Sequence, residues 1–256
     1  MAKSRRREKE SKIMPQIKIT DRIFYIPSCE KPLSADVGIV RGDERVYLFD
    51  AGSTPETLEF LHSLKGNCDI VVSHFHGDHT WWLTGHKKGD EGMEEGDELS
   101  LTYERPRFGR IYVGSYTSRY IPDGEVISTP TVISHRPGQG TDADKSAGIS
   151  GTSDLYDGVK VCVYPLPNSH CKGALAMMVD DEYLFLGDAT YCMTKNGVPV
   201  YNAQLLKDEI ELLKRLPAKY CLISHDKRFV REKRVLLRQL ESIYAKRRQD
   251  SPYIEV

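Results

Sequence analysis

Apolar residues in the first part of the chain fall in short runs rich in β-branched side chains. These runs occupy residues 17–19, 22–26, 36–40 and 45–50. Strands this close together predict an antiparallel meander. A helix is predicted next, over 53–66, because Ser53 and Glu56 have the spacing of a capping box and Gly66 stands where a helix ends.

The rest of the chain repeats the order of strands followed by helix. Strands are predicted at 69–74, 110–114, 159–166, 174–180, 182–188 and 220–225. Apolar residues recur at helical spacing over 202–216, and a basic helix is predicted near 230–248. The chain therefore falls into two β-rich halves, each followed by helix, which is typical of a layered α/β domain.

Two segments, 85–109 and 121–155, show no periodicity. The first is rich in glycine and charge, and we expect either a lid or a disordered surface insertion. The second holds three prolines and five glycines, so we expect irregular structure. Because such segments determine specificity, the sequence does not name a substrate.

The 256 residues suffice for one well-cored domain, predicted at 14–256. Residues 1–13 form a charge cluster without an apolar face, which predicts a disordered basic tail. The 36 basic and 37 acidic residues nearly cancel, so we expect a small-molecule substrate and no nucleic-acid or membrane partner. The six scattered cysteines and the absence of a signal-peptide pattern predict a cytoplasmic location. The oligomeric state stays open.

Residues 73–80, SHFHGDHT, place four metal-binding side chains on one loop after a predicted strand. His74, His76 and His79 would repel one another on protonation unless a cation held them, and Asp78 lies among them. Further side chains that bind metals stand at the ends of other predicted strands. They are Asp50, His170, Asp188 and His225.

These motifs, in this order, resemble those of the metallo-β-lactamase fold superfamily of hydrolases. The resemblance implies an α/β fold, the four-layer αββα sandwich, with two metals at one edge. It also implies that His74, His76 and His170 hold the first metal. The second would be held by Asp78, His79 and His225, Asp188 would bridge the two, and Asp50 would brace the metal-binding loop without touching a metal.

Imidazole and carboxylate donors without thiolate favour two Zn²⁺ per chain, although iron and manganese accept the same donors. Two cations about 4 Å apart lower the pKa of a water held between them toward about 7, so hydrolysis by a bridging hydroxide is the expected reaction. The expected substrate is a small ester, thioester, lactone or amide. Asp78 and Tyr191 are the candidate catalytic residues.

The chain also departs from the usual pattern of the superfamily that it resembles. Asp188 stands where the familiar di-zinc β-lactamases carry cysteine, so cleavage of β-lactams is not the expected activity. Tyr191 follows in an Asp-Ala-x-Tyr pattern similar to that of N-acyl-homoserine lactonases, which makes it a candidate oxyanion donor and makes a lactonase an alternative. Trp81 and Trp82 could line the pocket or pack in the core, and Lys172 could bind an anionic group or stay solvated.

Three other function classes use or resemble parts of this pattern. A persulfide-dioxygenase-like iron enzyme uses a similar His and Asp set and stays an alternative. A nuclease would need a basic surface that the sequence does not predict. A binding module with a relic site does not explain an intact set of metal-binding residues.

Overall fold

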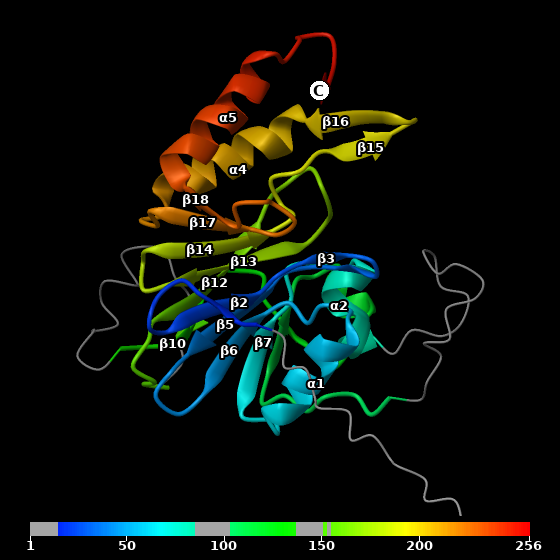
Figure 1. Cartoon of the computed structure of the whole chain (residues 1–256). Coiled ribbons are helices and arrows are strands. Elements are labelled where there is room, and N and C mark those ends of the chain that lie inside the picture. The colour runs from blue at the N-terminus through cyan, green and yellow to red at the C-terminus, as the bar shows by residue number, and fades with distance from the viewer. Residues whose placement is uncertain (1–14, 85–102, 137–150, 153–154) are drawn as a thin grey trace, which may run out of the picture.

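Two seven-stranded β-sheets, stacked face to face, form the centre of the computed structural model (Figure 1). It describes residues 15–84, 103–136, 151–152 and 155–256. In the first sheet, neighbouring strands are antiparallel from β1 to β6 and parallel from β6 to β9. The order across this sheet is β1 (Ile17–Lys18), β2 (Ile23–Ile26), β5 (Val37–Arg41), β6 (Val46–Phe49), β7 (Cys68–Val71), β8 (Ile111–Val113) and β9 (Glu125–Val126).

The second sheet is built mainly from the other half of the chain. Its pairs are antiparallel except for β10 with β11 and β14 with β17. The order is β11 (Gly151–Thr152), β10 (Thr131–Ser134), β12 (Val161–Leu166), β13 (Ala174–Val179), β14 (Tyr183–Gly187), β17 (Tyr220–Ile223) and β18 (Val230–Glu232). Two small sheets complete the strands: β3 (Cys29–Glu30) with β4 (Leu33–Ser34), and β15 (Met193–Lys195) with β16 (Val198–Asn202) and β19 (Tyr253–Glu255).

Helices cover the outer face of each sheet (Figure 1). The helices α1 (Pro55–Ser63) and α2 (Gly77–Thr84) bury Leu61 and Trp82 against strands of the first sheet. The helices α4 (Ala203–Arg215) and α5 (Lys233–Ala245) bury Leu206 and Leu240 against the second. A third apolar cluster lies between the sheets. The result is the predicted αββα four-layer sandwich.

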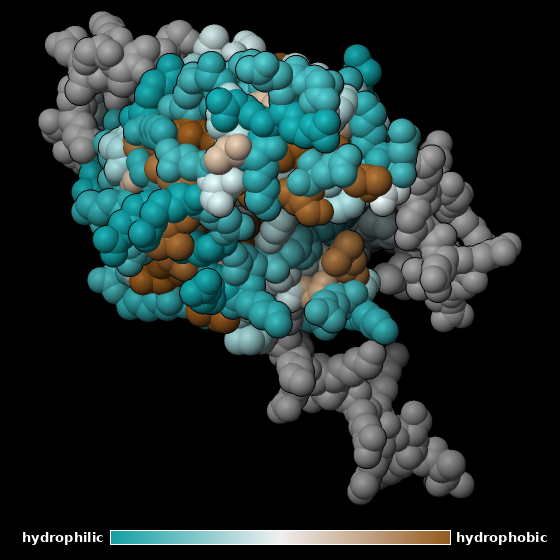
Figure 2. Space-filling view, turned by 90° about the horizontal axis from the view of Figure 1, so that it is seen from above, coloured by the Kyte–Doolittle hydropathy of each residue, from teal (hydrophilic) through white to brown (hydrophobic). Residues whose placement is uncertain are grey.

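The side of α4 and α5 that faces away from the sheets is mostly polar. Viewed from above, this face of the molecule carries mainly hydrophilic residues, with hydrophobic ones in scattered patches (Figure 2). An amphipathic helix that packs one face on a sheet shows this pattern. Among the described helices, none is long and apolar enough to cross a membrane.

The predicted start of α1 is wrong by one residue. The N-cap is Thr54, whose side chain accepts a hydrogen bond from the Thr57 backbone N–H at 3.3 Å. Ser53 instead donates its hydroxyl to the Leu33 carbonyl at 2.6 Å, so it joins the helix to the β3–β4 hairpin. This tertiary contact outcompetes the local capping box.

The structure tests the prediction for one of the two aperiodic segments and leaves the other largely untested. Residues 121–155 are less irregular than predicted, because β9, β10 and β11 lie within them and pair with the two sheets. The predicted lid or insertion at 85–109 falls largely outside the described residues, as does the predicted tail at 1–13. Both stay predictions.

Candidate metal centre

The candidate metal-binding side chains converge from both sheets on one end of the sandwich. His74 and His76 follow β7, His170 follows β12, Asp188 follows β14 and His225 follows β17. Strand ends at one edge of a layered α/β fold bring residues from distant parts of the sequence together. The convergence predicted from sequence is therefore present in the structure.

The sequence predicts that the motif HFHGDH lies on a loop, but only its first half does. Helix α2 begins at Gly77, so Asp78 and His79 belong to its first turn. The backbone N–H groups of His79 and Thr80 both donate to the His76 carbonyl at 3.1 Å. These hydrogen bonds anchor the first turn of α2 on His76. Helix geometry therefore fixes the position of His79 relative to His76.

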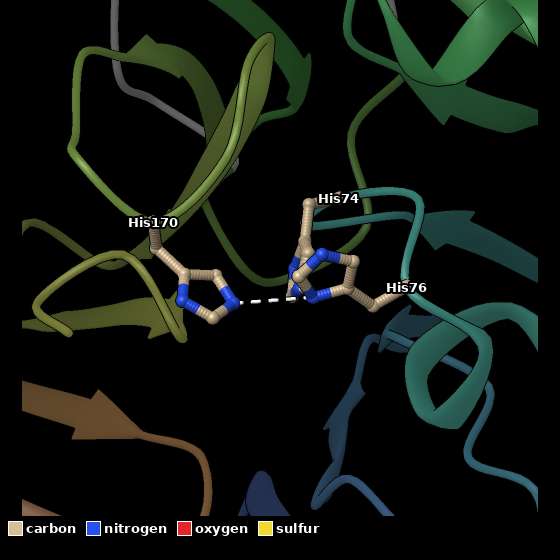
Figure 3. Close-up of side chains that lie close together, drawn as sticks. All are labelled: His74, His76 and His170. Atoms are coloured by element: carbon tan, nitrogen blue, oxygen red, sulfur yellow. Dashed lines mark hydrogen bonds between the residues drawn. The ribbon is translucent and has the colours of Figure 1, made fainter. Parts of the chain in front are cut away.

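Three imidazoles form a first group of donors (Figure 3). Nε2 of His74 lies 2.9 Å from Nδ1 of His76, and Nε2 of His170 lies 3.1 Å from the same atom. Donors on a tetrahedral zinc with bonds of 2.0–2.1 Å lie about 3.4 Å apart. The three nitrogens are therefore close enough to share one ion.

The Ser73 hydroxyl orients His74. It lies 2.9 Å from Nδ1 of His74, so a proton on Nδ1 can be donated to Ser73 while Nε2 keeps its lone pair. Burial lowers the pKa of His74 well below its ordinary value, and the imidazoles of His79 and His76 lower it further. The ring is thus neutral, which is the form that binds a metal.

Asp78, His79, Asp188 and His225 form a second group of donors. Nε2 of His225 lies 3.0 Å from Oδ2 of Asp78. Nε2 of His79 lies 3.5 Å from Oδ2 of Asp78 and 3.5 Å from Oδ2 of Asp188. Since Oδ2 of Asp188 is also 3.5 Å from Nε2 of His170, one carboxylate joins the two groups.

Two buried atoms of this group have no hydrogen-bond partner within the described part of the chain. They are Nε2 of His79 and Oδ1 of Asp188. Buried polar atoms without partners are costly, and a cation would satisfy both. The residues present therefore fit a dinuclear metal site.

Asp50 supports His79 from the side away from the other donors. Its Oδ2 lies 2.7 Å from Nδ1 of His79, and its Oδ1 accepts a hydrogen bond from the Ser73 backbone N–H at 2.7 Å. A carboxylate behind a ligating histidine fixes the ring and makes it a stronger ligand. Burial lowers the pKa of His79, but Asp50 and Asp188 outweigh it and raise that pKa well above its ordinary value.

Comparison with known proteins places this fold and site in a family. The family model described as the metallo-beta-lactamase superfamily matches residues 31–225. The chain belongs to the metallo-β-lactamase superfamily. The search of curated proteins found no significant match.

Solved structures share the superfamily fold at low sequence identity. A metallo-beta-lactamase from Pontibacter korlensis is 17% identical, with a TM-score of 0.53 over 91% of this chain and 99% of that one. A B3 metallo-beta-lactamase with an active-site glutamic acid is 9% identical, with a TM-score of 0.58 over 91% and 90%. A flavo di-iron protein mutant from Thermotoga maritima is 13% identical, with a TM-score of 0.55 over 90% and 61%. The superfamily fold is thus shared by proteins of different chemistry.

Sequence reasoning missed Asp36 in this superfamily member. Its carboxylate is buried and accepts a hydrogen bond from the His225 backbone N–H at 2.9 Å. The sequence showed only an acidic residue opening a predicted strand, and no spacing linked it to His225. The pair lies 189 positions apart, so only the fold brings it together.

The remaining predicted site residues lie in different environments. The Tyr191 hydroxyl donates to the Ser224 carbonyl at 2.7 Å, although its ring centroid is only 6.4 Å from that of His170. Trp82 is buried in the core under the first sheet, where its indole N–H donates to Thr57. Trp81 is half-buried against the same core, and Lys172 is exposed. Of the two roles that the sequence left open for Trp82, the structure shows core packing.

An aromatic cluster lies beside the first group of donors. The Phe75 ring lies edge-on to His76, with centroids 4.8 Å apart, and stacks on Tyr120 at 5.2 Å. Tyr116 lies 5.1 Å from Phe75. Tyr120 is 46% exposed, so apolar surface extends outward from the metal-binding residues. We call Phe75, Tyr116 and Tyr120 the aromatic wall.

Proposed function

We propose that the chain is a hydrolase that uses two metal ions, with zinc the expected element, to cleave a small ester, thioester, lactone or amide. One observation carries the proposal. The Asp188 carboxylate lies 3.5 Å from a ring nitrogen of His170 in one donor group and of His79 in the other. A shared carboxylate of this kind favours two ions held side by side.

Two bound cations would supply a water of lowered pKa and would polarise the carbonyl oxygen of the substrate. The chain's own residues keep the donors in place. Asp50 and Ser73 orient His79 and His74 through their Nδ1 atoms. Asp78 directs its Oδ2 into the same space as the ring nitrogens of His79 and His225, where it would bind a metal and accept a hydrogen bond from water.

The aromatic wall favours one kind of substrate. Pockets for small molecules are lined mainly by apolar and aromatic side chains, with a few polar groups for orientation. Because Phe75 lies between two donor residues in the sequence and against His76 in space, an apolar acyl group bound over the metals would contact this wall. We therefore propose acyl substrates with an aryl or alkyl group.

An iron-dependent oxidation is the second candidate. Its support is the donor set itself, in which all seven side chains offer nitrogen or oxygen, because iron accepts such donors as readily as zinc. Metal analysis together with oxygen consumption separates the two functions. The lactonase alternative loses support, because the hydroxyl proton of Tyr191 is donated to Ser224 and is not available to an oxyanion in this arrangement.

We also propose a cytoplasmic location and a small-molecule partner. All six cysteines are free, which suits a reducing compartment. The near balance of charge provides no overall field for a nucleic acid or an anionic membrane.

The test combines metal analysis with a substrate screen. The purified protein is assayed against matched esters, thioesters, lactones, amides and phosphodiesters, with His170→Ala as the inactive control. Hydrolysis of a carbonyl substrate that is lost in the variant and after treatment with a chelator supports the proposal. Activity only on phosphodiesters, or oxygen uptake without hydrolysis, would overturn it.

A further inference from the structure

Asp36 joins the two sheets next to the second donor group. It lies immediately before β5, whereas Ser224 and His225 follow β17 in the other sheet. Its Oδ2 accepts hydrogen bonds from the His225 N–H at 2.9 Å and from the Ser224 hydroxyl at 3.2 Å. Its Oδ1 accepts from the Ser28 N–H at 3.0 Å, and its own N–H donates to the Ser224 hydroxyl at 3.0 Å. Both carboxylate oxygens of Asp36 therefore accept hydrogen bonds from other segments of the chain.

The backbone held by Asp36 has an unfavourable conformation. His225 has a φ of 59°, in the left-handed region that side-chain-bearing residues rarely adopt. Such a conformation persists when the surroundings enforce it. The Tyr191 hydroxyl contributes from the other direction through its bond to the Ser224 carbonyl at 2.7 Å. The peptide between Ser224 and His225 is thus held from two sides.

We propose that Asp36 is a positioning residue that sets the place of His225 and so governs retention of the second metal. The inference rests on the proposed dinuclear centre. His225 Nε2 lies 3.0 Å from Asp78 Oδ2, so a shift of the His225 backbone would open the second donor group. Within the described part of the chain, the hydrogen bonds of Asp36 join it to Ser28, Ser224 and His225, none of which belongs to the first group of donors, so that group should stay intact.

The chain offers a matched control in Asp157. This buried carboxylate also joins distant segments, because its Oδ2 accepts from the Tyr47 hydroxyl at 3.0 Å and from the Arg45 N–H at 3.1 Å. Arg45 precedes β6 and Asp50 follows it, so Asp157 lies at the opposite end of that strand from the metal centre. Loss of this carboxylate should lower stability without touching a metal ligand.

The experiment titrates Zn²⁺ into four metal-free proteins: the wild type, Asp36→Asn, Ser224→Ala and Asp157→Asn. The wild type should bind two Zn²⁺ ions, and Asp157→Asn should bind both with the dissociation constants of the wild type. In Asp36→Asn an amide NH₂ group replaces one of the two accepting oxygens. The dissociation constant of the second metal should therefore rise about 10- to 100-fold, the range for residues that orient metal ligands. The dissociation constant of the first metal should be unchanged. Ser224→Ala should show a smaller rise. Thermal unfolding of the metal-free proteins measures the stability loss separately.

An Asp36→Asn protein that binds both ions as the wild type does would overturn the inference. So would an equal loss of the second ion in Asp157→Asn, since the effect would then follow from stability alone. If Asp36→Asn does not fold, Ser224→Ala carries the same comparison. A wild type that binds fewer than two ions would instead contradict the proposed dinuclear function.

Discussion

Nε2 of His170 lies 3.1 Å from Nδ1 of His76, although the two residues are 94 positions apart. One comes from the strand end of β12 in the second sheet and the other from the loop after β7 in the first. Because each sheet supplies part of the donor set, the centre exists only when the two halves are packed together. Metal binding should therefore be coupled to the stability of the whole sandwich.

Asp188→Ala should abolish retention of the second metal and lower kcat/KM at least about 100-fold, since residues that merely orient ligands already cost 10- to 100-fold. The fold should persist, because Asp188 lies at a strand end and not in an apolar cluster. Metal content, activity and circular dichroism measure the three effects. Asp181→Ala, in the turn that precedes β14, is the control. Full turnover with two metals in the Asp188 variant would refute the bridging role.

Tyr191→Phe distinguishes two roles for one hydroxyl. Because that hydroxyl donates to the Ser224 carbonyl, we expect the variant to bind the second metal more weakly and to regain its rate when metal is in excess. The oxyanion role predicted from sequence gives a different result, a rate about 10- to 1000-fold lower at full metal content. Rates measured across a metal titration decide between them.

Tyr120→Ala tests the aromatic wall. The variant should lose about 2- to 10-fold in kcat/KM for a phenylacetyl ester, the equivalent of one aromatic contact, and little for the acetyl ester of the same alcohol. Tyr156→Ala is the matched control, because Tyr156 is also exposed, at 54%, but adjoins Asp157 at the far end of β6. Equal losses of kcat/KM on both esters would show that the aromatic wall does not contact the acyl group of the substrate.

Glu209 should make stability depend on pH. It lies fully buried on α4, and burial raises its pKa well above its ordinary value of 4.5, with no hydrogen-bond partner for either oxygen among the described residues. The unfolded chain ionises above about pH 4.5 while the folded chain stays protonated, so stability falls as pH rises toward the folded pKa, by about 1.4 kcal/mol per unit. Glu209→Met removes this dependence.

The check is urea unfolding of the wild type and Glu209→Met at pH 5, 6.5 and 8. The stability advantage of the variant should grow with pH across this range. A constant difference would mean that Glu209 does not stay protonated in the folded chain.

The ligand set could be predicted because its signals are local. Three histidines and an aspartate within six residues stand out in the sequence, and His170, Asp188 and His225 each follow an apolar run that ends at one edge of the fold. The alternation of strands and helices indicates a layered α/β domain, and the four-layer arrangement is what the resemblance to the superfamily implies. Short-range pattern thus suffices for the class of fold and for the donors.

Asp50 was expected to brace the metal-binding loop, but the other supporting residues could not be predicted, because their roles depend on three-dimensional contacts. Trp82 faces the core because α2 begins at Gly77, which puts His79, Trp82 and Leu83 on one buried face of the helix. The sequence pattern predicts a loop at this motif, and a loop defines no such buried face. Asp36 has no periodic signature, and its partners Ser224 and His225 lie in the other half of the chain.

The central claim is that two metals share Asp188, and anomalous X-ray diffraction from crystals of the metal-loaded protein tests it most directly. The account predicts two peaks about 4 Å apart, one among His74, His76 and His170 and the other among Asp78, His79 and His225, with the Asp188 carboxylate between them. A single peak, or two peaks of which Asp188 contacts only one, would contradict it.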